Sequence, residues 1–429
     1  MSISSSIFSS ITSGGCTPLI TLNMPAGFEW FTGSNALYNN NTTSFDVTAF
    51  RNNTGKTYYV DQAGSDANDG LTLGTAFATV EKARTFADAD IIELSPGRYP
   101  LAFWGGTGGT SLNLTTICKT GRAELLASNL DDTSNFAASA GAGVFEWAGF
   151  AAECYSVWDE SIDNGYGGWG WVLPQTSAAN VESNGGWYVD TVLDILYVKL
   201  SDSRQPDIDV RVNTQRRAYV GIDNGSEYYE GIDFRGGSLT SWDFSAGRKL
   251  YYNNCSSGYV GARDNSNFDT NSDTEAYYVN CQAFSAYKDC FGHRGSSKAT
   301  EIDCTAYDTR LPGSNNASTT HDTCSSIRIN CNYHDTTGDT CVDVSSLGSF
   351  LLGVDSYNTF STTAKSDFNY TGGGGLGVGM WLINCSNNPT LPSQSTYAIE
   401  GSGKKFWQNT EDNIVGSVIN AVPVDVVLY

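Results

Sequence analysis

The chain has 429 residues, of which 46 are acidic and 24 are basic, so its formal net charge is −22. A charge of this sign argues against nucleic acids and anionic membrane surfaces as partners, because their phosphates would be repelled. No stretch approaches the roughly 18 consecutive apolar residues of a membrane-spanning helix, so no membrane insertion is predicted. Abundant Tyr, Phe, Gly, Asn, Ser and Thr predict an all-β protein with many short strands.

Residues 1–56 contain no repeat and are predicted to form a separate N-terminal module. The opening "MSISSSIFSSITSGG" lacks the positive region and the continuous apolar run of a secretion signal. Eleven cysteines, an odd number spread thinly along the chain, do not fit a disulfide-rich secreted scaffold. We therefore expect the chain to fold in a reducing cytoplasm, with mostly free thiols. A protein that folds there can still function outside the cell.

The segment 57–99 has a distinctive order of elements. A strand is followed by a loop rich in Gly, Asp and Asn, an amphipathic helix from about Ala76 to Asp88, the strand "DIIEL" and a Ser-Pro-Gly turn. This order resembles the opening of pectin-lyase-like right-handed β-helix proteins, in which a helix caps the first coil. A cap is needed because an uncovered first coil exposes a strand edge. The matching residues are Tyr59, Val60, Asp61, Gly64, Ser65, Asp66, Asn68, Asp69, Gly70, Phe77, Ala78, Thr79, Pro96, Gly97 and Tyr99.

An inserted β subdomain is predicted at about 104–212. The segment 185–207, "GGWYVDTVLDILYVKLSDSRQPD", is similar to a hairpin found in such insertions, and its alternation supports two paired strands. In "WDESIDNGYGGWGW", aromatic rings stand among acidic residues and glycines. Such rings pack well against the C–H faces of sugars while acids hold the hydroxyls. The predicted carbohydrate-binding residues are Trp158, Tyr166, Trp169 and Trp171, with a subdomain core or a subunit interface as the alternative.

The C-terminal half repeats a short strand phrase that ends in Asn or Asp followed by Cys. The phrases end at Cys255, Cys281, Cys304, Cys331 and Cys385, with degenerate copies at Phe234 and Ser356. Successive intervals are 21, 26, 23, 27, 25 and 29 residues, the period of a solenoid. A leucine framework is missing, and a propeller blade needs about 40 residues, so a parallel β-helix fits best. We expect the cysteines to fill its interior and the Asn and Asp residues to lie at its corners.

A second series of acidic residues follows the Cys phrases, at Asp264, Asp289, Asp322 and Asp339, and all three histidines lie in the same part of the chain. Carboxylates on one face can supply the acid and base of glycoside hydrolysis. A neighbouring His could instead remove the proton α to a uronic acid carboxylate. The predicted catalytic residues are Asp289, His293, His321, Asp322 and Asp339. Turn capping and a structural calcium ion remain alternatives, while no zinc spacing and no cofactor motif is present.

The organisation as a whole resembles bacteriophage tailspike or tail-fibre-type proteins. It combines a short N-terminal module, a capped β-helix at 57–395 and the strand-like tail "SVINAVPVDVVLY" within 396–429, a predicted C-terminal cap or trimer contact. The resemblance implies a homotrimer in the virion tail, held by other tail or baseplate proteins through residues 1–56. It also implies binding of host surface polysaccharide and, in many such proteins, its depolymerisation. The alternatives are a free polysaccharide lyase, epimerase or hydrolase of the pectin-lyase-like class, and a non-catalytic structural virion protein.

Overall fold

The computed structural model describes residues 45–100, 113–130, 133–165, 168–215, 225–240, 247–261, 266–309 and 315–357, Cys385, and short strands outside these ranges. Most of the predicted N-terminal module and C-terminal segment lies outside the described residues. A small antiparallel sheet near the N-terminus consists of β1 (Ile20–Thr21), β2 (Leu37–Asn39) and β3 (Thr42–Thr43).

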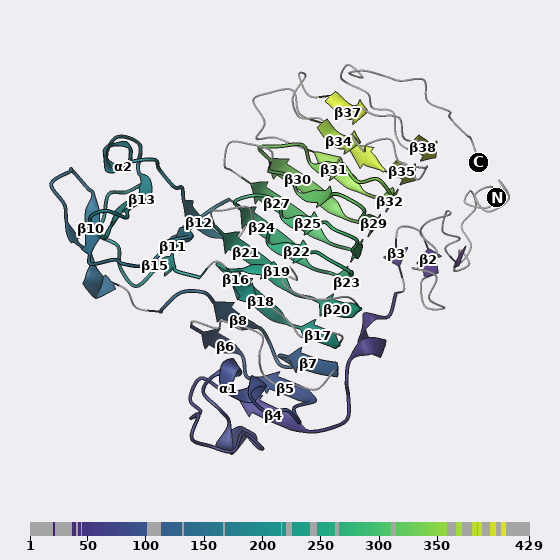
Figure 1. Cartoon of the computed structure of the whole chain (residues 1–429), viewed down its shortest axis with the longest axis horizontal. Coiled ribbons are helices and arrows are strands. Elements are labelled where there is room, and N and C mark those ends of the chain that lie inside the picture. Colours follow the sequence, from purple (N-terminus) through teal and green to yellow (C-terminus); the bar gives the residue numbers. More distant parts are fainter. Residues whose placement is uncertain are drawn as a thin grey trace.

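The chain winds into a right-handed parallel β-helix whose coils stack along one axis (Figure 1). In the described part, the strands of the coils form three parallel sheets, and the first coils contribute to two of them. Sheet 1 contains β4 (Thr57–Val60), β5 (Ile91–Leu94), β7 (Asn113–Ile117), β17 (Ser226–Glu230), β20 (Arg248–Asn253), β23 (Thr274–Val279), β26 (Lys298–Ile302), β29 (Ser325–Ile329), β32 (Gly348–Leu352), β35 (Met380–Ile383) and β38 (Lys405–Gln408).

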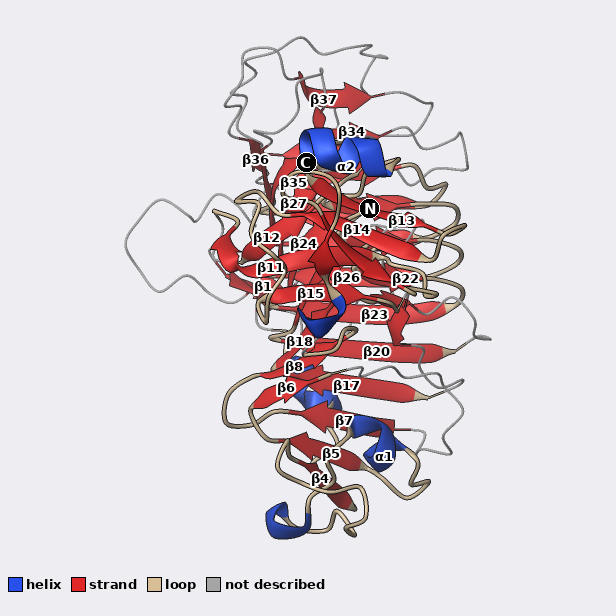
Figure 2. Ribbon diagram, turned by 90° about the vertical axis from the view of Figure 1, so that its left-hand side faces the viewer, coloured by secondary structure: helices blue, strands red, loops and turns tan. Residues whose placement is uncertain are grey.

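The other two sheets complete the coil and run along the same axis. Sheet 2 contains β6 (Gly97–Tyr99), β8 (Ala123–Leu126), β18 (Ile232–Arg235), β21 (Ser256–Val260), β24 (Gln282–Ala286), β27 (Thr305–Thr309), β30 (Asn332–Thr336), β33 (Asp355–Tyr357) and β36 (Ser386–Asn387). Sheet 3 contains β16 (Arg217–Tyr219), β19 (Ser238–Thr240), β22 (Phe268–Thr270), β25 (Phe291–His293), β28 (Ser318–Thr320), β31 (Cys341–Asp343), β34 (Ser366–Tyr370) and β37 (Ser395–Ile399). Figure 2 shows the ladder of sheet 1 strands from the side.

The repeated Asn-Cys phrase marks the corner between sheets 1 and 2. Asn254, Asn280, Asp303 and Asn330 all have left-handed backbone, with φ between 51° and 52°, a conformation that Asn and Asp tolerate better than other side chains. The N–H of each donates to a carbonyl of the next coil, as from Asn280 to Ile302 over 2.9 Å. The cysteines that follow are buried free thiols inside the coil. Both predictions about the phrase are confirmed.

The capping helix is present but shorter than predicted. Helix α1 covers Val80–Arg84, and Thr79 caps it by accepting a hydrogen bond from the N–H of Lys82 over 3.2 Å. The prediction began too early because Phe77 is extended and exchanges backbone hydrogen bonds with β4 and the residue after it, Tyr59 and Asp61. Val80 and Ala83 are buried in the core that closes the first coil. The short 3-10 helices η3 (Val47–Phe50), η4 (Leu73–Thr75) and η5 (Thr133–Asn135) complete the loops.

A lateral subdomain, residues 133–213, projects from the stack (Figure 1). It contains β9 (Ala137–Ala138), β10 (Phe145–Ala148), β11 (Ser156–Asp163), β12 (Trp169–Val172), α2 (Ala178–Asn184), β13 (Gly186–Asp190), β14 (Ile195–Lys199) and β15 (Val210–Asn213). The predicted hairpin is present as the antiparallel pair β13–β14. The predicted start of the insertion near residue 104 is too early, because β7 and β8 pair with coil strands on both sides.

The segment 45–52 lies along the outer face of sheet 1. Phe50 stacks on Tyr251 with ring centroids 4.2 Å apart, and Phe45 stacks on Tyr277 at 5.3 Å. The Asn52 N–H donates to the hydroxyl of Thr115 on β7 over 2.8 Å. These contacts attach the chain that precedes the cap to the side of the β-helix. No helix in the described part of the chain is long and apolar enough to cross a membrane.

Candidate functional site

Two of the five predicted catalytic residues lie inside the β-helix rather than on its surface. His293 is fully buried, with Nε2 2.9 Å from Glu301 Oε1 and Nδ1 3.1 Å from the Thr270 hydroxyl. Burial lowers the pKa of His293. Asp289 is buried too, where its Oδ1 accepts hydrogen bonds from the backbone N–H and the side-chain amide of Asn316, both over 3.0 Å. Burial raises the pKa of its carboxyl. His293 faces inward because of its position in β25 of sheet 3, whereas Asp289 precedes β25 and is buried against Asn316.

The other three lie at turns. Asp322 is exposed, and its Oδ2 accepts the N–H of Gly295 over 3.0 Å. Asp339 is half-buried, and its Oδ2 accepts from the Asn369 side chain over 2.9 Å. Both carboxylates thus serve as turn or side-chain acceptors, which was the alternative interpretation. A catalytic role for the five residues stays a prediction.

His321 should make the stability of the fold depend on pH. Burial, with the nearby charges of Arg294 and Lys288, lowers the pKa of His321 to about 4 from 6.5, although Asp322 acts in the opposite direction. The unfolded chain therefore binds this proton at higher pH than the folded chain does. The stability contributed by the neutral imidazole is fully present above about pH 6.5 and is lost as the pH falls toward 4.

We expect His321 to account for a loss of about 2–3 kcal/mol of unfolding free energy between pH 7.5 and pH 4.5. Asp289, with its raised pKa, acts in the opposite direction, so the informative quantity is the difference between wild type and His321→Gln. Urea titrations of both proteins across this range should give a flatter pH profile for the variant. Parallel profiles would contradict the assignment.

The four predicted carbohydrate-binding aromatic residues divide into different environments. Trp158 and Trp171 are opposite each other on β11 and β12, and both are buried in the core between the subdomain and sheet 2. Trp158 stacks on Tyr259 at 5.2 Å. Neither ring face is open to a sugar, so for these two residues the core alternative was correct. Tyr166 lies outside the described residues. Trp169 is half-buried and lines a cleft.

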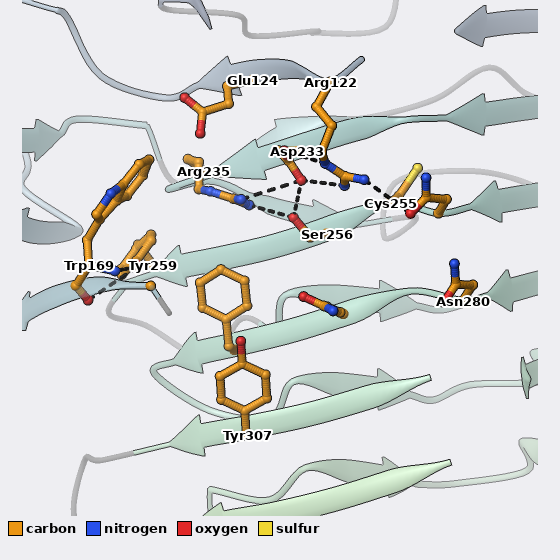
Figure 3. A pocket seen from close by; sticks show the side chains of 14 residues that line it. Arg122, Glu124, Trp169, Asp233, Arg235, Cys255, Ser256, Tyr259, Asn280 and Tyr307 are labelled. Atoms are coloured by element: carbon orange, nitrogen blue, oxygen red, sulfur yellow. Dashed lines mark hydrogen bonds and ion pairs between the residues drawn. The ribbon is translucent and has the colours of Figure 1, made fainter. Parts of the chain in front are cut away.

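This cleft, of about 530 Å³, lies between the outer face of sheet 2 and the start of β12. Its lining residues are Arg122, Glu124, Gly168, Trp169, Asp233, Arg235, Asn254, Cys255, Ser256, Tyr259, Asn280, Gln282, Phe284 and Tyr307. Figure 3 shows Asp233 between the side chains of Arg122 and Arg235, with Trp169 and Tyr259 together at one end. Five coils and the subdomain therefore contribute to one concave surface.

The parallel register of sheet 2 arranges the floor of the cleft in two rows. Glu124, Asp233, Ser256 and Gln282 are successive partners in one row, which is polar. Arg235, Gly258, Phe284, Tyr307 and His334 form the second row, two residues further along each strand. Rings stack along the second row, with Phe284 5.5 Å from Tyr307 and Tyr307 5.1 Å from His334. A Cβ atom at Gly258 would lie 2.4 Å from the Phe284 ring, so a larger residue there would require this ring to move.

Asp233 is the electrostatic centre of the floor. Arg122 donates to both of its oxygens, from Nε over 2.7 Å and from Nη2 over 2.5 Å, while Ser256 donates its hydroxyl proton. Arg235 Nη2 lies 3.4 Å away. Burial by itself would raise the pKa of Asp233, but Arg122, Arg235 and Ser256 outweigh it and lower the pKa below its usual value. The carboxylate is therefore ionised at neutral pH and fixes two guanidinium groups.

The wall of the cleft is equally fixed. The Trp169 ring lies 5.6 Å from the Tyr259 ring and 5.4 Å and 5.8 Å from the guanidinium carbons of Arg98 and Arg235. Its backbone N–H donates to the Tyr259 hydroxyl over 2.5 Å. Arg98 also joins the subdomain to sheet 2. Its Nε lies 2.7 Å from Glu124, and its Nη1 donates over 2.9 Å to Glu160 of β11. The cleft is thus preformed.

Sequence reasoning missed the charged residues of this floor. The phrase ending at Phe234 was recognised as a degenerate repeat, and the residues on either side of Phe234, Asp233 and Arg235, are the ones that face the cleft. Two opposite charges at alternating positions of a short strand were the available signal. Within the described ranges, no group of three or more His, Cys, Asp or Glu residues is placed to hold a metal ion.

The sequence matches no protein-family model and no curated protein. Three solved structures are similar in fold. One is described as XylC with xylose (TM-score 0.51, 12% identity, covering 83% of this chain and 70% of that chain). A second is a glycoside hydrolase (0.51, 8%, 84% and 97%), and a third is a rhamnogalacturonan lyase (0.42, 13%, 82% and 73%). At such identities the likeness concerns the fold alone, and the first two support the right-handed parallel β-helix.

Proposed function

We propose that the protein binds a polysaccharide in the cleft between sheet 2 and the lateral subdomain. The observation that carries the proposal is the pairing of a polar row with an aromatic row on one fixed concave floor. Sugars present hydroxyls at their edges and C–H groups on their faces, and this surface offers partners for both. XylC with xylose and the glycoside hydrolase share the fold, which supports a carbohydrate ligand.

A polymer fits the floor better than a single sugar. Both rows run along the axis of the β-helix, with one residue per coil and a spacing of about 4.8 Å between neighbouring strands. The aromatic row continues past Tyr307 to His334, one coil further. A linear glycan lying along the axis would meet equivalent positions on successive coils.

Substitutions in the wall and the floor of the cleft should weaken polysaccharide binding. We expect Trp169→Ala to raise the dissociation constant about 5-fold, since stacking contributes about 1 kcal/mol. Gln282→Ala, at an exposed position on the floor, should raise it about 3- to 10-fold through one lost hydrogen bond. Tyr188→Ala, on β13 and away from the cleft, is the matched control. Affinity electrophoresis in gels containing bacterial surface polysaccharides measures all three, and unchanged binding in both cleft variants refutes the site.

We further propose that the polysaccharide is a host surface glycan and that the protein is a homotrimeric spike of a phage tail. The attachment of segment 45–52 to the flank of the β-helix supports this, because it gives the preceding residues a firm base for holding other tail proteins. Mass spectrometry of purified particles should detect the chain, and sedimentation should give a trimer mass. If the chain is absent from purified particles, the protein is better explained as a free carbohydrate-active enzyme.

A further inference from the structure

We propose that the glycan bound in the cleft carries carboxylate groups and that Arg122 selects them. This inference rests on the proposed polysaccharide binding and adds the chemical class of the ligand. A carboxylated glycan is not what the net charge of −22 by itself would favour, since the protein as a whole repels anions. A carboxylate is nevertheless expected because of the way in which the floor of the cleft holds the guanidinium group of Arg122.

Arg122 is held rigidly and still has donors to offer. Its Nε and Nη2 donate to Asp233, and its Nη1 donates to Asn254 Oδ1 over 3.1 Å. A guanidinium has five N–H donors, so these three bonds leave one N–H on Nη1 and one on Nη2 without a partner among the described residues. The side chain is 39% exposed, the most accessible charged group among the ion pairs of the floor. These two free donors belong to the two terminal nitrogens, which lie in the plane of the guanidinium.

This arrangement suits a carboxylate better than a hydroxyl. Two parallel N–H groups of a fixed guanidinium match the two oxygens of a carboxylate in a bidentate pair. Because Asp233 and Asn254 already fix the plane of the group, little side-chain entropy is lost when the ligand binds. The asparagine belongs to the corner ladder, where its backbone is left-handed, with φ 51°.

The charges that line the cleft differ from those of the whole protein. Two cationic residues, Arg122 and Arg235, and two carboxylates, Glu124 and Asp233, line it, so its local charge is zero by the count 2 − 2. Arg235 is 10% exposed beside Asp233, so Arg122 is the more accessible of the two cations. On a protein with a net charge of −22, an anion in this cleft therefore meets little repulsion from nearby groups and an accessible guanidinium.

The test uses carboxylated polysaccharides and their carboxyl-reduced forms, which keep the backbone and lose the charge. Polygalacturonate, alginate, hyaluronate and polysialate are the probes, with dextran and dextran sulfate as neutral and sulfated references. We expect at least one carboxylated polymer to bind about 10- to 100-fold more tightly than its reduced form, the range for hydrogen bonds to a charged group. Arg122→Gln should abolish that preference, and Arg122→Lys should restore it only in part. Thermal unfolding of each variant checks that the fold is intact.

Each outcome distinguishes this inference from the proposed function. Binding that is equal for a polymer and its reduced form, or binding of neutral polymers alone, overturns the carboxylate inference and leaves polysaccharide binding standing. Binding of dextran sulfate without any carboxylated polymer overturns it as well. An unchanged preference in Arg122→Gln assigns the recognition to another residue and refutes the role of Arg122. Failure of every polymer to bind counts against both proposals.

Discussion

Replacing Arg328 with Met is expected to lower the free energy of unfolding by about 3–5 kcal/mol, the usual cost of removing one partner from a buried ion pair. Arg328 on β29 is fully buried inside the coil, 3.4 Å from the equally buried carboxylate of Glu301 on β26. It also donates to the hydroxyls of Ser318 and Thr320 over 2.8 Å and 2.7 Å. Met retains the apolar stem but none of these donors.

The large loss of stability expected for Arg328→Met comes from the buried Glu301 carboxylate that stays in the lumen. Glu301 also accepts from the Tyr333 hydroxyl over 2.7 Å and contacts His293, so it is the centre of a network. Burial by itself would raise the pKa of Glu301, but His293, Arg328 and Ser318 together lower it. Without Arg328, this ionised carboxylate loses its full positive partner in a medium of low polarity. Adding Glu301→Gln to Arg328→Met should therefore cost less than the sum of the two single changes.

Unfolding in guanidinium chloride, followed by circular dichroism, measures these differences in stability, and the unfolding rates are a second readout. Lys249→Met is the matched control, since Lys249 is 50% exposed and pairs with Glu275 over 3.5 Å. Such an exposed pair should contribute below about 1 kcal/mol. A loss under about 1 kcal/mol for Arg328→Met would show that the lumen network does not stabilise the fold.

Replacing Asp233 with Ala is expected to weaken polysaccharide binding by about 30-fold or more, because one carboxylate fixes both arginines of the cleft. Its removal leaves Arg235 nearly buried without a carboxylate and frees Arg122 to adopt many rotamers. Removing one partner of a buried ion pair costs about 3–5 kcal/mol of folding stability, whereas a 30-fold loss of affinity corresponds to about 2 kcal/mol. We also expect the melting temperature to fall by several degrees.

Asp233→Asn separates shape from charge. It keeps the size of the side chain, so it should preserve more stability than Asp233→Ala while losing most of the binding. A carboxyl whose pKa is lowered in the folded state stabilises the fold above its unfolded pKa near 3.9, and this contribution is lost as the pH falls through the lower, folded value. The Asp233→Asn variant should therefore lose less stability than wild type below pH 4. Glu93→Ala, which removes an exposed contact with Lys119 on sheet 1, is the control. Wild-type binding in Asp233→Asn would contradict the role of the carboxylate.

The fold could be predicted because its determinants repeat along the chain. The Asn-Cys phrase recurs once per coil, and each copy supplies a corner residue that tolerates left-handed backbone and a small residue for the interior. The opening segment likewise carries its own cap. The length of α1 was overestimated because helical periodicity does not show that Phe77 pairs with β4, a contact that depends on how the first coil closes.

The residues of the candidate site could not be predicted in the same way. Asp289 and His293 carry the residue types of a catalytic site, yet both are buried, His293 by its position in sheet 3 and Asp289 by its contact with Asn316 in the segment before β25. Trp158 and Trp171 are residue types of a sugar-binding platform, yet both are buried in the core that the subdomain shares with sheet 2. Each of these outcomes depends on which face of a strand meets a neighbour, and a pattern of residue types does not contain that information.

The sequence alone determined the architecture, a capped parallel β-helix with buried thiols, because successive coils repeat the same strand, corner residue and small interior residue. Only the tertiary structure decided where a ligand could bind. The cleft joins Arg122 and Glu124 of an early coil, Trp169 of the lateral subdomain, and Asp233 to Tyr307 of later coils. These residues are far apart in the chain and meet because parallel strands stack about 4.8 Å apart and because Arg98 and Tyr259 hold the subdomain against sheet 2.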